Sequence, residues 1–109
     1  LVYGYAPDGS FADVHKHFWV QCEAIAAAWR LYSVTGEEAY RKDYARLWQY
    51  CWDHLVDHKY GAWFRILDRD GKWIDNLKSP AGKVDYHTMG ACWDVLQVMA
   101  TTAKKSEAI

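Results

Sequence analysis

Apolar residues recur at intervals of three and four positions in three long segments of the chain. This spacing predicts helices over about residues 14–33, 37–57 and 85–103. The second segment has one apolar and one charged face, whereas the first and third are apolar on most sides. Because a helix that is apolar on most sides is buried on most sides, we expect one outer helix and two largely buried ones.

Short extended segments are predicted before the first helix and after the second. Residues 1–13 read as an extended segment with a turn at Pro7-Asp8-Gly9-Ser10. Residues 62–67 and 72–74 read as a β-hairpin whose turn is Asp70-Gly71. A small hairpin is therefore inserted into a chain that is otherwise helical.

Two further signals mark the ends of the predicted helices. Thr35, with Glu38 three residues later, predicts a capping box in which the Thr35 side chain caps the second helix. A loop that contains Pro80 and Gly82 separates the hairpin from the third helix.

The predicted helices alternate in burial, and three helices cannot cover two that are apolar on most sides. The pattern therefore indicates an all-α fold built as a ring of helical hairpins, with inner and outer helices. A three-helix bundle that forms a homodimer is the alternative arrangement. The chain has no starting methionine and begins within a predicted strand, so we expect further residues upstream.

The charge and composition of the 109 residues argue against several classes of protein. The formal net charge is -1 and no basic stripe is present, so we expect no nucleic acid and no membrane as partner. No stretch approaches the ~18–20 apolar residues of a membrane span, and the first residues do not resemble a signal peptide. The isolated cysteines Cys22, Cys51 and Cys92 occupy apolar helical positions, which predicts buried thiols in a reducing, cytoplasmic compartment.

The aromatic content is high, with seven Trp and eight Tyr. One interpretation is that the chain contributes a slice of a larger shared core. The other is that some of the rings line a carbohydrate site, because flat apolar ring faces stack on the C–H surfaces of sugars. The two interpretations are compatible.

The first candidate site residues are Trp19 and Glu23, which are four apart and share one face of the first helix. An aromatic plane beside a carboxylate can hold a sugar ring, by stacking and by hydrogen bonds to hydroxyl groups. The alternative is a core tryptophan and a surface glutamate that pairs with Lys16 or Arg30.

The second candidate site lies at the start of the third helix. Asp85 is placed to cap that helix, and His87 falls in its first turn, where the helix dipole disfavours a positive imidazole. A histidine kept near neutrality can exchange protons at physiological pH. The alternative is a buried structural histidine.

Two histidine pairs have spacings that occur in metal sites, His15-x-His17 and His54-x-x-x-His58. Neither pair has a nearby cysteine or carboxylate set that completes a site. We therefore expect no metal and no other cofactor.

Three stretches of the chain resemble the N-acylglucosamine 2-epimerase family. The run Lys16-His17-Phe18-Trp19-Val20-Gln21-Cys22-Glu23-Ala24 resembles the family motif K-x-W-W-x-Q-A-E-A, and Lys83-Val84-Asp85-Tyr86-His87 resembles its terminal motif K-x-x-Y-H. Between them, further residues follow in the family's order: Tyr32, Thr35-Gly36, Tyr40, Trp48, His54, Asp57, Gly61, Trp63 and Phe64. Thr88-Met89-Gly90-Ala91-Cys92 is closer to the aldose–ketose isomerase branches, which include mannose isomerases, than to cellobiose 2-epimerases.

The resemblance implies that residues 1–109 are the C-terminal segment of a single (α/α)6-barrel domain. The family moves a proton at C2 of a sugar through an enediolate, without a metal, between two histidines. The terminal-motif histidine carries over to His87 as a catalytic residue, and its partner belongs to an earlier helix that this chain lacks. Trp19, Glu23 and Asp85 fall at positions implied to bind the substrate. We therefore expect the chain alone to be inactive.

The chain departs from the family pattern at two places. Phe18 stands where many relatives have Trp, and Gly90 stands where some have Arg. Two rival functions stay open: an (α/α)6 glycoside hydrolase with Glu23 and Asp85 as its two carboxyl groups, and a sugar-binding module that does not need His87.

Overall fold

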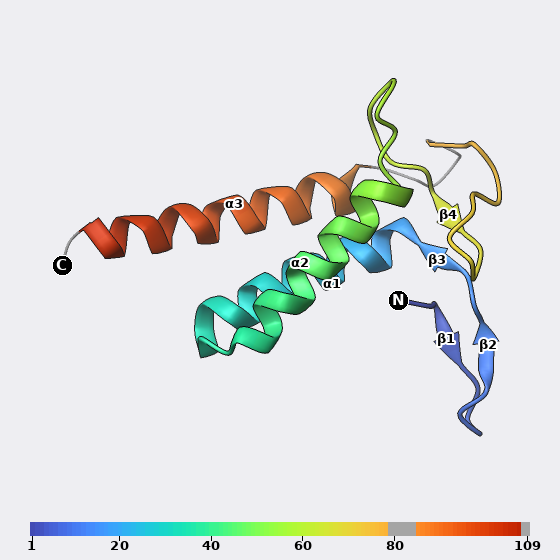
Figure 1. The fold of residues 1–109 in the computed structure, drawn as a ribbon, viewed down its shortest axis with the longest axis horizontal. Helices are drawn as coiled ribbons and strands as arrows, with labels where there is room; N and C mark the ends of the chain where they lie inside the picture. Colours follow the sequence, from blue (N-terminus) through green and yellow to red (C-terminus); the bar gives the residue numbers. More distant parts are fainter. Residues whose placement is uncertain (79–84, 108–109) are drawn as a thin grey trace.

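The computed structural model describes residues 1–78 and 85–107, with side chains as far as Thr101. The described residues form α1 (Phe18–Thr35), α2 (Glu38–His54) and α3 (Tyr86–Glu107), together with the short strands β1 (Gly4–Tyr5), β2 (Phe11–Asp13), β3 (Lys16–His17) and β4 (Ile66–Leu67) (Figure 1). The loop predicted around Pro80 and Gly82 lies outside the described residues.

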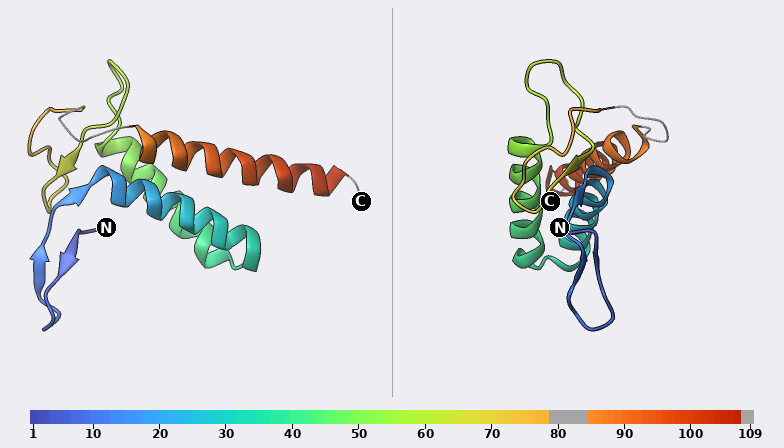
Figure 2. Two further views of the ribbon diagram at one scale, coloured as in Figure 1. Left: turned by 180° about the vertical axis from the view of Figure 1, so that it is seen from behind. Right: turned by 90° about the vertical axis from the view of Figure 1, so that its right-hand side faces the viewer.

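The fold is three helices with two small sheets at one end. α1 packs against both α2 and α3, and α2 runs back alongside α1 (Figure 2). α1 and α3 begin at the same end of the molecule, next to β3 and β4 (Figure 1). The predicted helical class and the three helices are confirmed, and their arrangement brings two helix starts together.

The first helix begins at Phe18, four residues later than predicted. Residues Lys16–His17 pair with Ile66–Leu67 in an antiparallel sheet, so their backbone groups are not free to start a helix. The Phe18 N–H donates to the carbonyl of Arg65 at 3.0 Å. The strand partner therefore fixes where α1 starts.

The predicted capping box at Thr35 does not form, although the Thr35 hydroxyl accepts from Glu37 N at 3.1 Å. Thr35 is the last residue of α1, and its hydroxyl donates to the Leu31 carbonyl at 2.8 Å. Gly36 follows with φ 71°, a left-handed conformation that commonly ends helices at glycine. The N-cap of α2 is Glu37, which makes no side-chain cap bond. The Thr-Gly pair ends one helix rather than starting the next.

The hairpin predicted from residues 62–67 and 72–74 is confirmed in its turn and in a short stretch of pairing between its arms. Asp68 N donates to the Lys72 carbonyl at 2.8 Å, and Gly71 has φ 87°. A Cβ at position 71 would lie 2.9 Å from the Tyr50 hydroxyl, so a larger residue there would also have to displace the Tyr50 side chain. The ladder partner of β4 is β3, and Leu67 meets Trp73 only in an isolated bridge.

The core lies where α1, α2, α3 and β4 meet. Its buried members are Phe18, Cys22, Ile25, Cys51, Leu55, Leu67, Ala91 and Val95. Cys22 and Cys51 are buried thiols as predicted, whereas Cys92 is exposed. Cys92 differs because it faces a space between α2 and α3 that the described residues leave open.

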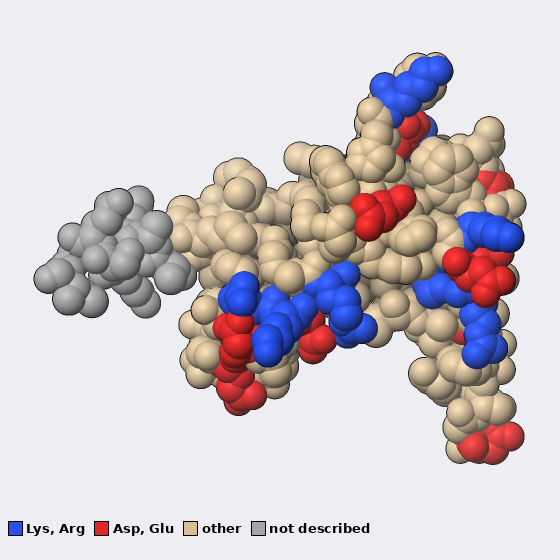
Figure 3. Space-filling view, in the orientation of Figure 1, with Lys and Arg blue, Asp and Glu red and all other residues tan. Residues whose placement is uncertain are grey.

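The prediction that α3 is buried on most sides does not hold within this chain. α3 does carry apolar residues around its circumference, but α1 covers only one side of it. An exposed apolar stripe runs along α3, with relative exposures of 73% for Tyr86, 67% for Met89, 64% for Trp93 and 60% for Leu96. In the space-filling view the part of this helix up to Thr101 shows almost no charged atoms, while charges gather over α2 (Figure 3). None of the described helices is long and apolar enough to cross a membrane.

Candidate active site

The starts of α1 and α3 carry a carboxylate and an imidazole in direct contact. Nδ1 of His87 lies 2.7 Å from Oε1 of Glu23, although the two residues are 64 positions apart. Glu23 is in the second turn of α1 and His87 is the second residue of α3. The contact therefore depends on the packing of α1 against α3.

This contact defines which ring nitrogen of His87 can do chemistry. An ionised carboxylate only accepts hydrogen bonds, so Nδ1 is the nitrogen that carries the hydrogen towards Glu23. The neutral ring then has its lone pair on Nε2. A carboxylate that orients an imidazole in this way prepares Nε2 to take up or release a proton.

Aromatic rings surround the pair. The ring centroid of Trp19 lies 5.7 Å from that of His87, with the planes tilted by 39°. Phe18 and Tyr86 meet the His87 ring edge-on at 6.2 and 5.1 Å. The imidazole is thus held between rings of α1 and its own helix, with Trp19 on the same helix as Glu23.

The first turn of α1 is anchored by a buried glutamine. Gln21 is fully buried, and its Nε2 donates to the carbonyls of Leu1 at 2.9 Å and His17 at 3.2 Å. Burial lowers the pKa of the neighbouring His17, whose Nε2 lies 4.0 Å from Asp13. The segment before β1 is therefore tied to the helix that carries Trp19 and Glu23.

The structure brings together three of the four predicted site residues. Trp19, Glu23 and His87 form one cluster. Asp85 is exposed, its carbonyl accepts from Met89 N at 2.9 Å, and none of the described residues donates to its carboxylate. The predicted side-chain cap is therefore not observed among the described residues. Lys83 and Val84 of the terminal motif lie outside them.

The alternative partners considered for Glu23 are engaged elsewhere. Lys16 donates through Nζ to the carbonyls of Asp68 and Arg69 in the β4 turn. Arg30 lies 4.0 Å from Asp94 of α3. Neither cation pairs with Glu23, which contacts His87 instead.

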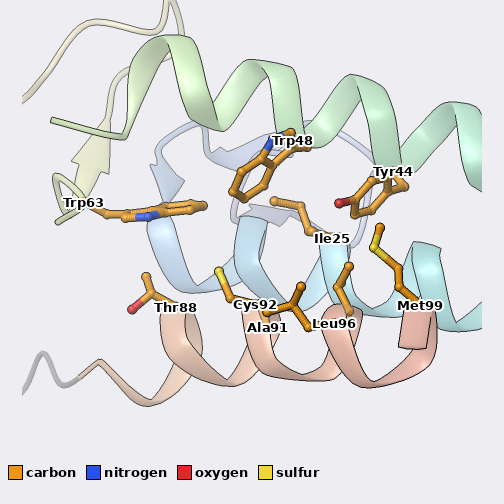
Figure 4. Close-up of a pocket in the computed structure, with 10 residues that line it drawn as sticks. Ile25, Tyr44, Trp48, Trp63, Thr88, Ala91, Cys92, Leu96 and Met99 are labelled. Atoms are coloured by element: carbon orange, nitrogen blue, oxygen red, sulfur yellow. The ribbon is translucent and has the colours of Figure 1, made fainter. Parts of the chain in front are cut away.

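A separate apolar cavity of about 210 Å³ lies between α2 and α3, over α1 (Figure 4). Its lining residues are Ile25, Tyr44, Trp48, Trp63, Thr88, Ala91, Cys92, Val95, Leu96 and Met99. Trp19, Glu23 and His87 do not line it. A sugar would find few hydrogen-bond partners there, so the polar cluster at the helix starts is the better candidate site.

The histidine pairs with metal-like spacing are in simple polar contacts. Nδ1 of His15 lies 3.3 Å from Asp13, and Nε2 of His58 is 2.8 Å from the Trp52 carbonyl. Within residues 1–78 and 85–101, no three His, Cys, Asp or Glu side chains gather as a metal site would require.

Two features of the site were missed at the sequence level. The Glu23–His87 contact has no local sequence signal, because its partners lie on different helices. Tyr3, whose ring meets Trp19 at 5.9 Å, was treated only as part of an extended segment. A sequence signal did exist for the Glu23–His87 contact. Both residues fall near the starts of predicted inner helices, and a ring of helical hairpins would bring those starts to the same end of the molecule.

Comparison with known proteins finds one matching family and several similar proteins. Residues 1–91 match the family described as N-acylglucosamine 2-epimerase (GlcNAc 2-epimerase). The chain is 58% identical over 99 residues to D-mannose isomerase of Marinomonas mediterranea, covering 91% of this chain and 25% of that protein.

Solved structures agree with this match. A crystal structure of D-mannose isomerase superposes with a TM-score of 0.85 at 59% identity, over 89% of this chain and 25% of that one. The cellobiose 2-epimerase of Spirochaeta thermophila gives 0.83 at 30% identity, over 94% and 26%. The chain thus spans about a quarter of the length of these relatives and matches part of their helical barrels. It belongs to the N-acylglucosamine 2-epimerase family.

Proposed function

We propose that this chain is the C-terminal part of a sugar isomerase or 2-epimerase and that it works only as part of a longer gene product. The Glu23–His87 contact beside Trp19 is the observation that carries this proposal. The similarity to a D-mannose isomerase and to a cellobiose 2-epimerase supports the same reaction class.

The reaction is proton transfer at C2 of an aldose. A proton next to a carbonyl is weakly acidic, so its removal needs a well-placed base and a donor to the oxyanion that develops. We assign His87 Nε2 to one of these roles, and Trp19 to stacking against the sugar. The second acid–base group lies outside this chain, and the proposed proton transfer needs no metal.

The enediolate that forms can give two products. Protonation at C1 yields the ketose, and protonation at C2 from the other face yields the epimer. Because one half of the acid–base machinery is missing here, the isolated chain should be inactive. Loss of one member of a cooperating catalytic pair removes most of the rate.

Deuterium exchange tests the proposal. The product of the complete gene that encodes these residues is incubated with mannose in D2O, and the C2 proton, fructose and glucose are followed by NMR. We expect deuterium at C2, and a roughly 10²- to 10⁴-fold slower exchange for His87→Asn, the range that general acid–base catalysis contributes. The product distinguishes isomerase from epimerase.

A matched variant controls for the loss of any histidine. His58→Asn changes an exposed histidine in the loop after α2, and it should exchange at the wild-type rate. Exchange that is equally fast in His87→Asn would contradict the catalytic role of His87. Tight sugar binding with no exchange across mannose, cellobiose and N-acetylglucosamine would favour a binding module.

A further inference from the structure

We propose that Tyr3 is a specificity-determining residue whose ring contacts the end of the sugar remote from C1 and C2. This inference rests on the proposed function and deepens it. It assigns a substrate contact to the β1–β2 hairpin, which lies outside both sequence motifs.

Three aromatic rings form a row that begins at the reacting group. His87 contacts Trp19 at 5.7 Å, and Trp19 meets Tyr3 edge-to-face at 5.9 Å with an interplanar angle of 78°. Among the described residues no ring contact joins Tyr3 to His87 directly. If C2 of a hexose lies at His87 and its ring stacks along Trp19, then C5 and C6 lie next to Tyr3.

The backbone holds Tyr3 in this row. Tyr3 N donates to the His15 carbonyl at 3.0 Å, and the next residue, Gly4, pairs with Asp13 across the hairpin. On the other side, the buried Gln21 side chain binds the Leu1 carbonyl. Backbone bonds before and after Tyr3 therefore give its ring a defined place.

The ring itself stays available. Tyr3 is 52% exposed, although its ring centroid lies 4.7 Å from that of His17. No described residue hydrogen-bonds to the Tyr3 hydroxyl. An open ring face next to a stacking tryptophan suits the apolar C–H surface at C5 and C6 of a hexose.

Sugars that differ only at C6 test this contact in the complete gene product. Lyxose is mannose without its C6 hydroxymethyl group, and xylose bears the same relation to glucose. We expect Tyr3→Ala to lower kcat/KM for the hexose roughly two- to tenfold, the range of one aromatic contact, mainly through KM. The pentose should change by less than about twofold, and Tyr3→Phe should restore the hexose value.

Tyr5→Ala is the matched control. Tyr5 lies in β1, two residues after Tyr3, but its ring stacks on Phe11 at 5.0 Å and makes no ring contact with Trp19 among the described residues, so this variant should keep wild-type kinetics. Equal losses for hexose and pentose in Tyr3→Ala, or no loss in either, would overturn the inference while leaving the proposed function intact.

Failure of the proposed function has a different signature. Saturation-transfer NMR measures sugar binding independently of turnover. A wild-type protein that binds but does not exchange the C2 proton still tests Tyr3 through the hexose–pentose difference in binding. A wild-type protein that neither exchanges nor binds any of these sugars would overturn both proposals together.

Discussion

At the scale of single residues, the exposure of Glu23 indicates what its contact with His87 is for. The Glu23 side chain is 56% exposed, and an ion pair this open contributes little to stability. Orientation of the imidazole is a better account, because the carboxylate fixes Nδ1 and leaves Nε2 to react. The sequence predicts Glu23 as a sugar contact; from its contact with His87 we propose a positioning role in addition.

Kinetics of Glu23 variants separate these two roles. If Glu23 positions His87, Glu23→Ala should lower kcat of the complete gene product roughly ten- to hundredfold with little change in KM, the size of one charge-assisted hydrogen bond. Glu23→Gln keeps an acceptor oxygen and should recover part of the rate. Glu37→Ala, at the exposed α1–α2 turn, is the control. A rise in KM at constant kcat would instead make Glu23 a sugar contact only.

At the scale of elements, the sequence predicted what is local and missed what is not. Helical periodicity located α1, α2 and α3, since each signal lies within its own segment. It could not locate β3, because Lys16–His17 are extended only through pairing with Ile66–Leu67, some fifty positions away. The same limit applies to the site: Trp19 and His87 were identified from motifs, but their contact arises from the packing of α1 against α3.

The loop after α2 is an element whose stability depends on pH. The Asp57 carboxylate accepts from Lys78 Nζ at 2.6 Å and from the N–H groups of Lys59 and Tyr60 at 2.8 and 3.1 Å. The Lys78 bond, followed by the two backbone bonds, lowers the pKa of Asp57 from 3.8 to about 2. Because the folded-state pKa is depressed, the stabilisation is complete above about pH 4 and is lost as the pH falls towards 2.

Denaturant unfolding of the complete gene product between pH 7 and pH 2.5 checks this. At pH 7, Asp57→Asn should unfold at a lower denaturant concentration than the wild type. As the pH falls to 2.5, the variant should lose less stability than the wild type, because it has no carboxylate at position 57 to protonate. Lys78→Met removes the main cause of the low pKa and should show most of the same change. If the unfolding midpoints of the wild type and Asp57→Asn fall in parallel with pH, Asp57 is not a source of the pH dependence.

At the scale of the whole molecule, apolar surface exceeds what three helices can cover. The α3 stripe of Tyr86, Met89, Trp93 and Leu96 is open, and the cavity between α2 and α3 is apolar. Exposed apolar patches of this kind mark surfaces that are covered by other parts of a protein or by partners. The relatives are about four times as long as the matched segment, which is consistent with further helices over this surface.

Replacing Trp93 should improve the solution behaviour of the isolated chain but destabilise the complete gene product. In the isolated chain, Trp93→Lys should reduce binding of a hydrophobic dye and reduce self-association, because it breaks the exposed stripe. In the complete gene product it should lower the free energy of unfolding by roughly 3 kcal/mol, since a covered tryptophan is lost. Gln49→Lys on the exposed face of α2 should do neither. Unchanged stability of the complete product would mean that nothing covers this stripe.

The pairing of Glu23 with His87 also has an evolutionary consequence. The two side chains come from helices far apart in the chain, yet each is placed by the other. A mutation that removes the carboxylate leaves an imidazole without its orienting partner, and loss of the imidazole leaves the carboxylate with nothing to hold. We therefore expect a change at one of these two positions to be tolerated only together with a change at the other, in any protein that keeps this helix packing.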